Sequence, residues 1–390
     1  MRACLRQSRV ECGGSADETL KVSVYRGVAA VDEHEWDALV GDRNFYNSHA
    51  WLAGLDHALG ACEVLAVWSP AGLLAACPLW DGGRDDGLFE LGAFFADVRG
   101  PWTRGFVWGG GRRSTHNEIA AIRGRRRPQV VRRLLQSMNE QARERGLAGV
   151  VMPYMPLAAA QELAQTAGAS VLLHSAEANM DVPTDGLAGL MARWNAHDRG
   201  QCKSEIAAFA RCGNRVECGR IDAANQAVAA ELIARNRARH GSAQGGAWMQ
   251  SLFDGQRRAG LLASSIAFVA RREQRILAVC VCYRFGRALH VRYFGCDYDL
   301  DDRDFRYFVL TCYEPIDYAA RQGLGELRLS TSALHAKAGR GARIEPLAAA
   351  VLLTDRALDP IAVHRHNRRF AERHRRELGA HLGPAWQAFL

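Results

Sequence analysis

The sequence predicts an α/β fold, a mixed sheet flanked by helices and built from two tandem halves. Three observations predict it. Segments with strand-like and helix-like patterns alternate along the 390 residues. The order of helices, strand meander, helix ended by glycine and strand occurs twice, which indicates a duplicated domain. Apolar residues make up 48% and charged residues 24% of the chain, a balance typical of globular proteins.

The first half is expected to begin with one strand and two helices. Asp32 is placed to cap the first helix, and Ser48 opens the second. A turn at 69–72 joins two strands, and Pro128 fits the first turn of a long helix that closes at Gly146. The expected elements are strands at 22–25, 64–68, 73–80, 147–152 and 170–173, and helices at 32–40, 48–59, 128–145 and 157–167.

The second half is expected to follow a helical pair and to contain a three-stranded meander. The expected elements are helices at 187–194, 198–212, 223–240, 248–260 and 303–321, and strands at 216–219, 265–271, 275–284, 288–295, 326–329 and 348–353. The chain is thus divided into an N-terminal domain at 20–180, a bridging helical segment at 181–215, a C-terminal domain at 216–356 that carries the site, and a basic helical tail at 357–390.

Composition argues against several classes of protein. No apolar run reaches the roughly 18 residues of a membrane span, so we expect a cytoplasmic protein without one. The eleven cysteines are odd in number and scattered, without the paired short spacing of a zinc site. We therefore expect free thiols and no metal.

The net charge of +8 comes mostly from arginine, which suits contact with phosphate. Two groups of arginines are candidates for binding tRNA or phosphate: Arg125, Arg126 and Arg127 before the long helix, and Arg368, Arg369, Arg373 and Arg376 in the tail. The tail spacings of three and four residues place several of them on one helix face. The alternative for the first group is a solvated basic loop, and the alternative for the tail is a capping helix with a solvent-exposed face.

Several motifs resemble the Fem-like and BioF2-like acyltransferases of the GNAT superfamily. The segment YFGCDY at 293–298, the helix with Tyr307 and Tyr313, and the strand at 327–330 are similar to the second domain of these proteins. Lys337 and the run at 339–342 continue that pattern. The similarity covers roughly residues 40 to 350, but the bridging helix carries fewer basic residues than the family's.

This resemblance implies two tandem GNAT-like domains and an N-acyltransferase. It favours transfer of an aminoacyl group from aminoacyl-tRNA to the amine of a small metabolite or precursor, with charged tRNA as a partner and no tightly bound cofactor. The second hypothesis is an N-acyltransferase that uses an acyl-CoA donor. The third is a non-catalytic protein that binds RNA or a partner. The one literal match to the CoA pyrophosphate motif, at 143–148, ends a helix, and four aspartates lie at 299–304 before the second-domain helix.

Amide formation needs a group that handles a proton and donors that stabilise an oxyanion. In GNAT folds a splayed central strand supplies the donors, here the strand at 289–295. The catalytic candidates are Glu314, Asp297 and Tyr313, near that strand and on the helix after it. A helix irregularity at Glu314-Pro315 and a turn role for Asp297 are the alternatives.

Polar residues on and beyond the central strand are candidates for binding substrate. His290 and Arg292 alternate on one strand face, which predicts a cavity lining. The candidates are His290, Arg292, Tyr307, Ser330, Lys337 and Arg340. A solvated loop is the alternative for Lys337 and Arg340.

Overall fold

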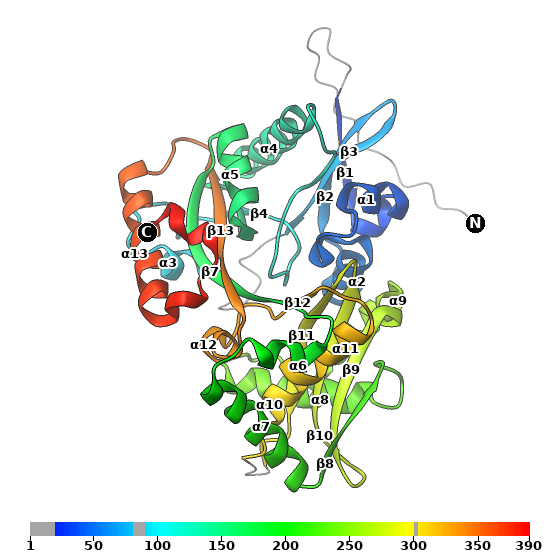
Figure 1. Cartoon of the computed structure of the whole chain (residues 1–390). Coiled ribbons are helices and arrows are strands. Elements are labelled where there is room, and N and C mark those ends of the chain that lie inside the picture. Colours follow the sequence, from blue (N-terminus) through cyan, green and yellow to red (C-terminus); the bar gives the residue numbers. More distant parts are fainter. Residues whose placement is uncertain (1–19, 81–89, 300–302) are drawn as a thin grey trace, which may run out of the picture.

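The computed structural model describes residues 20–80, 90–299 and 303–390. In this part of the chain, thirteen strands form one mixed sheet with helices on both faces (Figure 1). The predicted mixed α/β fold is therefore confirmed. No helix among these residues combines the length and apolar character needed to cross a bilayer.

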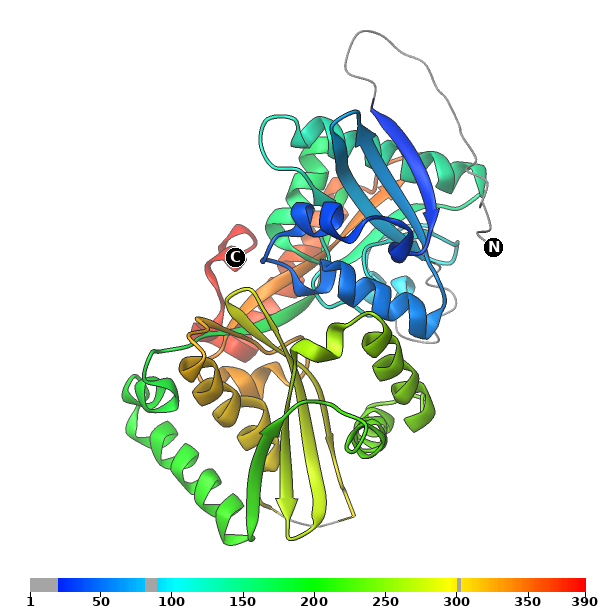
Figure 2. The same ribbon diagram turned by 90° about the vertical axis from the view of Figure 1, so that its right-hand side faces the viewer.

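The sheet has two lobes, seen from two sides in Figures 1 and 2. The N-lobe contains β1 (Lys21–Arg26), α1 (Glu33–Val40), α2 (His49–Leu59), β2 (Glu63–Ser69), β3 (Gly72–Trp80), α3 (Leu91–Phe94), β4 (Val107–Gly109), β5 (Ala120–Ala121), α4 (Arg127–Glu144), β6 (Gly149–Pro156), α5 (Leu157–Ala167), β7 (Ser170–Asp181), β13 (Arg343–Leu353) and α13 (Pro360–Leu378). The C-lobe contains α6 (Gly186–Ala192), α7 (Ala196–Arg211), β8 (Asn214–Gly219), α8 (Gln226–Arg239), α9 (Gly246–Arg258), β9 (Ser265–Arg272), β10 (Arg275–Phe285), β11 (Ala288–Cys296), α10 (Arg306–Phe308), α11 (Glu314–Arg321), β12 (Glu326–Arg328) and α12 (Leu334–Ala338).

The strands do not follow the expected domain boundaries. Their order is β1-β2-β3-β4-β6-β13-β7-β12-β11-β10-β9-β8, with β5 paired to β3. Strand β13 was expected to complete the C-terminal domain at 216–356, but it pairs antiparallel with β6 and β7. Its side chains from Pro346 to Val351 are buried, so this strand needs a neighbour on each edge and cover on both faces. The N-lobe therefore consists of residues 20–181 together with 343–390.

The helices begin where their capping residues predict. The Asp32 carboxylate accepts a hydrogen bond from the Glu35 amide at 3.0 Å, and the Ser48 hydroxyl accepts one from the Trp51 amide at 3.3 Å. These contacts satisfy amide groups that have no partner within the first turn. Helix α2 then turns Trp51 and Leu55 inward, into an apolar core shared with Phe253 of α9.

The long helix expected at 303–321 is interrupted. It consists of α10, a π-helical turn at Val309–Tyr313 and α11. The turn lies directly before Glu314-Pro315. Proline has no amide hydrogen and its ring collides with the carbonyl four residues earlier, so the regular ladder cannot continue through it. The irregularity that Glu314-Pro315 suggested in the sequence is therefore real, and it buries Tyr313.

Two glycines let helices from different lobes touch. Gly54 of α2 lies against Gln256 of α9, and a Cβ at Gly255 would lie 2.3 Å from the Gly54 carbonyl oxygen and 2.9 Å from Ala58 Cβ. No side chain fits in that space. The approach of α2 to α9 therefore depends on glycine at 255.

We expect Gly255→Ala to lower the free energy of unfolding by about 1–3 kcal/mol, because the added methyl group overpacks the contact between α2 and α9. Urea denaturation measures this. Gly200→Ala in α7 is the matched control, since nothing lies within 4 Å of its added Cβ. Alanine there favours the helix, so stability should rise by about 0.5–1 kcal/mol. Equal effects of the two changes would contradict the close contact.

Candidate functional site

A small pocket, the junction pocket, lies where the two lobes meet. Its lining residues come from both lobes: Arg43, Asn44, Tyr46, Thr115, His116, Glu177, His290, Arg328 and Ser330. Six of these nine side chains are ionisable, so its chemistry depends on which of them carry charge.

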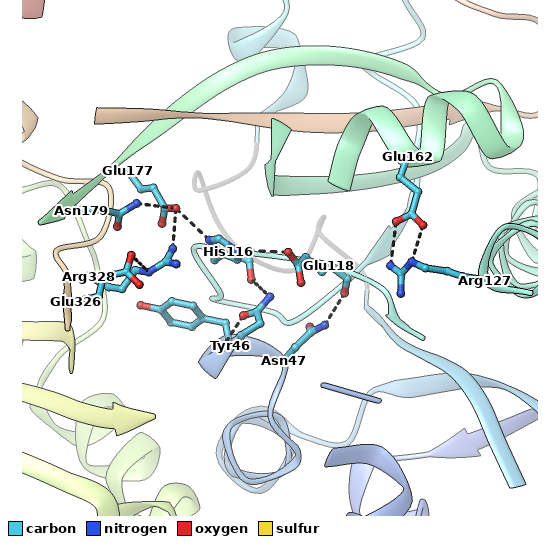
Figure 3. A network of polar contacts seen from close by, with 11 residues as sticks. Tyr46, Asn47, His116, Glu118, Arg127, Glu162, Glu177, Asn179, Glu326 and Arg328 are labelled. Carbon is cyan, nitrogen blue, oxygen red and sulfur yellow. Dashed lines mark hydrogen bonds and ion pairs between the residues drawn. The ribbon is translucent and has the colours of Figure 1, made fainter. Parts of the chain in front are cut away.

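Glu177 of β7 is the centre of the pocket's polar network (Figure 3). Its Oε1 accepts hydrogen bonds from His116 Nδ1 at 3.1 Å, Arg328 Nη1 at 3.3 Å and Asn179 Nδ2 at 3.3 Å. The Glu177 side chain is 7% exposed and that of His116 is 13% exposed. A buried carboxylate with three donors is held firmly in its ionised form.

The pKa of His116 is raised and that of Glu177 is lowered, so both groups are charged at neutral pH. Burial opposes a charged His116, but Glu177 and Glu118 outweigh it and raise the pKa of His116 to about 9. Burial also opposes a charged Glu177, but His116 and Arg328 lower the pKa of Glu177 to about 2. The pocket thus holds an imidazolium and a guanidinium on one carboxylate.

His290 of β11 differs from His116 because it is uncharged. Its ring is 5% exposed and lies against the rings of Phe45 and Tyr46, with centroids 5.0 and 5.9 Å away. Burial, together with the positive charges of Arg328 and His116, lowers the pKa of His290 to about 3. Its Nδ1 is buried and has no hydrogen-bond partner in the described residues. A buried ring nitrogen without a partner in a pocket wall is suited to contact a ligand.

The pocket forms where two parallel strands part. β11 and β12 pair only from Ala288 opposite Glu326 to His290 opposite Arg328. β12 ends at that pair, while β11 continues to Cys296. His290 and Arg328 are therefore neighbours at the fork, and both line the pocket.

Loops of the N-lobe close the other side. The Asn44 side chain accepts from the Tyr46 amide at 3.1 Å and donates to the His116 carbonyl at 3.2 Å. It ties the segment before α2 to the loop that carries His116. Ser330 follows β12 with a φ of 64°, a left-handed conformation unusual outside glycine. That turn places Ser330 in the pocket wall.

Of the six predicted substrate-binding residues, only His290 and Ser330 line the junction pocket. Arg292 Nη2 donates to the Arg113 carbonyl at 2.7 Å. Lys337 is 3% exposed, and its Nζ donates to the carbonyls of Leu329 and Ser332, both at 2.5 Å. The solvated loop considered for Lys337 is therefore wrong; it fastens the turn after β12, and burial lowers its pKa to about 8.

Arg340 and Tyr307 also lie away from the pocket. Arg340 Nη2 donates to Glu205 of α7 at 2.6 Å, and its guanidinium stacks 3.1 Å from the Phe308 ring centroid. The solvated loop is wrong for Arg340 too, because its side chain is only 10% exposed. The Tyr307 ring packs against Phe294, with centroids 5.0 Å apart.

The three predicted catalytic residues do not share a site with one another. Tyr313 donates to Glu205 at 2.5 Å, and burial and that carboxylate raise its pKa. Asp297, after β11, accepts from Arg275, and although burial opposes it, the Asp299 amide and Arg275 lower its pKa. Glu314 is half-buried at the start of α11, and burial followed by Asp317 raises its pKa. None of the three lines the junction pocket, and their catalytic roles stay predictions.

The candidate phosphate-binding arginines differ in exposure and in the side chains that they contact. Arg127 binds Glu162 in a bidentate pair and donates to the Ala121 carbonyl at 3.0 Å (Figure 3). Arg125 and Arg126 are exposed. In α13, Arg368, Arg369, Arg373 and Arg376 are exposed; Arg368 pairs with Glu372, Arg369 approaches Asp97 and Arg373 lies over the Phe370 ring.

Sequence reasoning missed His116, Glu177 and Arg328. Glu177 had one usable signal, since it interrupts the apolar run Ala176 to Ala178 in a strand buried along most of its length. His116 lies in a loop and Arg328 in a three-residue strand, and neither has a local pattern that marks it.

The FemAB-like family model, described as peptidoglycan biosynthesis/recognition, matches residues 114–382, more than half of the chain. No curated protein matches. The structure of FemX is similar with a TM-score of 0.55 at 11% identity, covering 82% of this chain and 96% of that one.

Two further structures have a comparable fold. The C-terminal domain of a putative lysylphosphatidylglycerol synthetase from Agrobacterium fabrum gives a TM-score of 0.52 at 13% identity, covering 86% of this chain and 95% of its own. A conserved protein of unknown function from Bacteroides thetaiotaomicron gives 0.53 at 11% identity, covering 83% and 98%. At these identities the likeness concerns the fold alone.

We expect Glu177→Gln to destabilise the protein most between pH 4.5 and 6.5. His116, raised from 6.5 to about 9, contributes stability that is complete below pH 6.5 and lost as the pH rises through 9. Glu177, lowered from 4.5 to about 2, contributes stability that is present above pH 4.5 and lost as the pH falls through 2. Urea unfolding of both proteins across this range measures the difference.

The control for this experiment is Glu372→Gln, which removes an exposed partner of Arg368 on α13. Its effect should stay within about 0.5 kcal/mol at every pH. A Glu177→Gln deficit that is the same at pH 5.5 and pH 9.5 would mean that His116 is not charged by this carboxylate.

Proposed function

This chain belongs to the FemAB-like family of acyltransferases, and on that premise we propose that it forms an amide bond. The donor is an aminoacyl-tRNA and the acceptor is the amine of a small metabolite or precursor. The family's description favours a precursor of the peptidoglycan type. The resemblance to Fem-like proteins found in the sequence is thereby confirmed.

The observation that carries the proposal is the junction pocket. It combines a neutral histidine, His290, with two cations, His116 and Arg328, that share the Glu177 carboxylate. Outside the lining, Glu118 also pairs with His116 and Glu326 with Arg328. Attack of an amine on an ester needs an acceptor for an N–H hydrogen and positive charge near the carbonyl oxygen. The pocket has both within one small space.

In the proposed reaction, each pocket residue has a separate role. The amine nitrogen attacks the ester carbonyl carbon while His290 Nδ1 accepts a hydrogen bond from it. Negative charge develops on the carbonyl oxygen and is stabilised by Arg328 and His116. The new C–N bond replaces the C–O bond to the ribose, and the nitrogen's proton passes to the leaving ribose oxygen. Glu177 keeps His116 charged and holds both cations in place.

The surroundings of α10 support a donor other than acyl-CoA. Asp304, just before this helix, is 1% exposed, and its carboxylate accepts from the amide of Arg306 at 3.2 Å and from its Nε at 2.7 Å. Asn214 Nδ2 donates to the same carboxylate at 2.6 Å. The Asp304 carboxylate thus already occupies the Arg306 amide at this helix start, so that amide is not open to a pyrophosphate.

The exposed arginines of α13 support a polynucleotide donor. Arg368, Arg369, Arg373 and Arg376 present a basic surface on the N-lobe. Contacts of this kind attract phosphates without reading sequence. A protein that only bound RNA would use the same surface, so activity has to be measured together with binding.

We expect tRNA affinity to fall steeply with salt, by about 0.7–0.9 in the log–log slope for each phosphate contact. Replacing Arg368, Arg369, Arg373 and Arg376 by Gln should flatten that slope by about 2 to 4 units. Filter binding of aminoacyl-tRNA across a salt series measures it. A control variant changes four exposed C-lobe arginines instead: Arg193, Arg211, Arg215 and Arg220. Equal slopes for both variants would remove α13 from tRNA binding.

A transfer assay with a labelled donor and an amine extract decides the reaction. Product from charged tRNA supports the proposal. Product from acetyl-CoA in the absence of tRNA would replace it by an acyl-CoA N-acyltransferase. Binding of tRNA without product from either donor would leave a non-catalytic RNA-binding protein.

We expect Arg328→Gln to lower kcat by about a hundredfold or more, since it removes a cation near the developing oxyanion. Glu314→Gln tests the competing site on α11, where loss of a proton-handling group would also cost about a hundredfold. Arg343→Gln is the surface control, because its side chain is 44% exposed. Full activity of folded Arg328→Gln beside a strong loss in Glu314→Gln would move the reaction to α11.

A further inference from the structure

Arginines gather around Trp248 beside the junction pocket. The Arg237 guanidinium of α8 lies 4.6 Å from the Trp248 ring centroid, and that of Arg113 lies 5.1 Å from it. Arg292 of β11 joins them through its hydrogen bond to the Arg113 carbonyl. Three guanidinium groups from three separate segments therefore share one region.

Arg237 and Arg292 have no acidic partner in the described part of the chain. Arg237 Nη2 donates to Ser242 Oγ at 3.1 Å and to Gln244 Oε1 at 2.5 Å, both neutral. The acidic side chain nearest in sequence on α8, Glu231, is taken by Arg235 at 3.2 Å. The Nε atoms of Arg237 and Arg292 are buried and have no hydrogen-bond partner among the described residues.

The positive charge of Arg237 is costly without an anion beside it. Burial and the positive charges of Arg113 and Arg292 lower the pKa of Arg237 to about 10. Like charges held together in a partly buried place repel one another, and buried donors without acceptors lose their hydrogen bonds to water. By contrast, the buried Arg340 is paired with the Glu205 carboxylate and the buried Arg306 with the Asp304 carboxylate.

We propose that Arg237 and Arg292, with Arg113 beside them, form a binding site for a phosphate group of the substrate. Guanidinium groups match phosphate oxygens in pairs, and Arg237 retains an Nε–H donor for this purpose. The side chains of Arg237 and Trp248 are partly exposed, so a ligand can reach them from solvent.

The site is connected to the junction pocket through Tyr46. The Arg292 guanidinium lies 5.7 Å from the Tyr46 ring centroid, and Tyr46 lines the pocket. A ligand anchored by its phosphate at the arginines would extend along Tyr46 toward His290. The inference thus rests on the proposed function for the identity of the ligand, and adds that one substrate carries a phosphate near its reacting end.

The test is a binding measurement with pyrophosphate, by isothermal titration calorimetry on the full chain. Arg237→Gln should weaken binding by about tenfold or more, as expected for loss of charged hydrogen bonds. Arg235→Gln removes the same charge two residues away on α8, from an exposed arginine bound to Glu231, and should change the affinity less than about threefold. Arg237→Lys keeps the positive charge but lacks the planar guanidinium group, so its affinity for pyrophosphate should lie between those of the other two variants.

Pyrophosphate binding that is equal in wild type and Arg237→Gln, or absent from the wild type at millimolar concentration, overturns the site. Thermal melts of each variant establish that it is folded, and Arg237→Lys replaces Arg237→Gln if the latter is not. Competition by a nucleoside diphosphate or by a CCA trinucleotide then identifies the source of the phosphate, and either result supports the site. A protein that binds pyrophosphate through Arg237 but transfers no aminoacyl group keeps the site and loses the proposed function.

Discussion

Strand β7 has to be hydrogen-bonded along both edges, and this requirement determines how the two lobes are joined. β13 covers one edge from Ser170 to Asn179, and β12 covers the other from Asn179 to Asp181. At the start of that second edge, α13 supplies side chains in place of a strand. Asn367 accepts from the Leu173 amide and donates to the Val171 carbonyl, each at 2.8 Å. Glu177 lies on β7 just before the strand passes from one lobe to the other, which is why the pocket forms there.

The ionisable groups of this protein divide by whether the fold itself neutralises them. Glu205 with Arg340, and Asp304 with Arg306, are compensated inside the protein and join segments distant in sequence or brace a helix start. The charges of the junction pocket also compensate one another. They line an open space, however, beside His290, whose Nδ1 has no hydrogen-bond partner among the described residues. An ionisable residue is a candidate for function when a hydrogen-bond donor or acceptor beside it has no partner within the protein.

Much of the fold could be predicted from the sequence because its signals are local. Asp32 and Ser48 mark helix starts by accepting hydrogen bonds from free amides, and Pro128 does so through its fixed φ and its missing amide hydrogen. The meander at 265–296 is recognisable from its turns. The place of β13 could not be predicted, because a strand pattern does not state which strands will be its neighbours. The interruption of the helix before Pro315 was visible in the sequence, but its consequence, a buried Tyr313 bound to Glu205, depends on a helix more than a hundred residues earlier.

The site was predicted less completely for the same reason. His290 was found because it is polar on a central strand, and Ser330 because it ends a strand that resembles the family pattern. Their partners come from the other lobe, and His116 and Glu177 are brought to them only by the continuous sheet. Asp297, Tyr313 and Lys337 were plausible by residue type, yet each has partners inside the fold that direct it away from the pocket.

The return of β13 also sets an order of assembly. A ribosome releases β6 and β7 early, but the strand that separates them comes only at residues 343–353. The C-lobe strands β8 to β12 lie within residues 214–328 and find all but one of their neighbours among themselves. The lobe that is synthesised first is therefore completed last. Until then β6 and β7 each present an open edge, a state in which pairing with another nascent chain competes with correct folding.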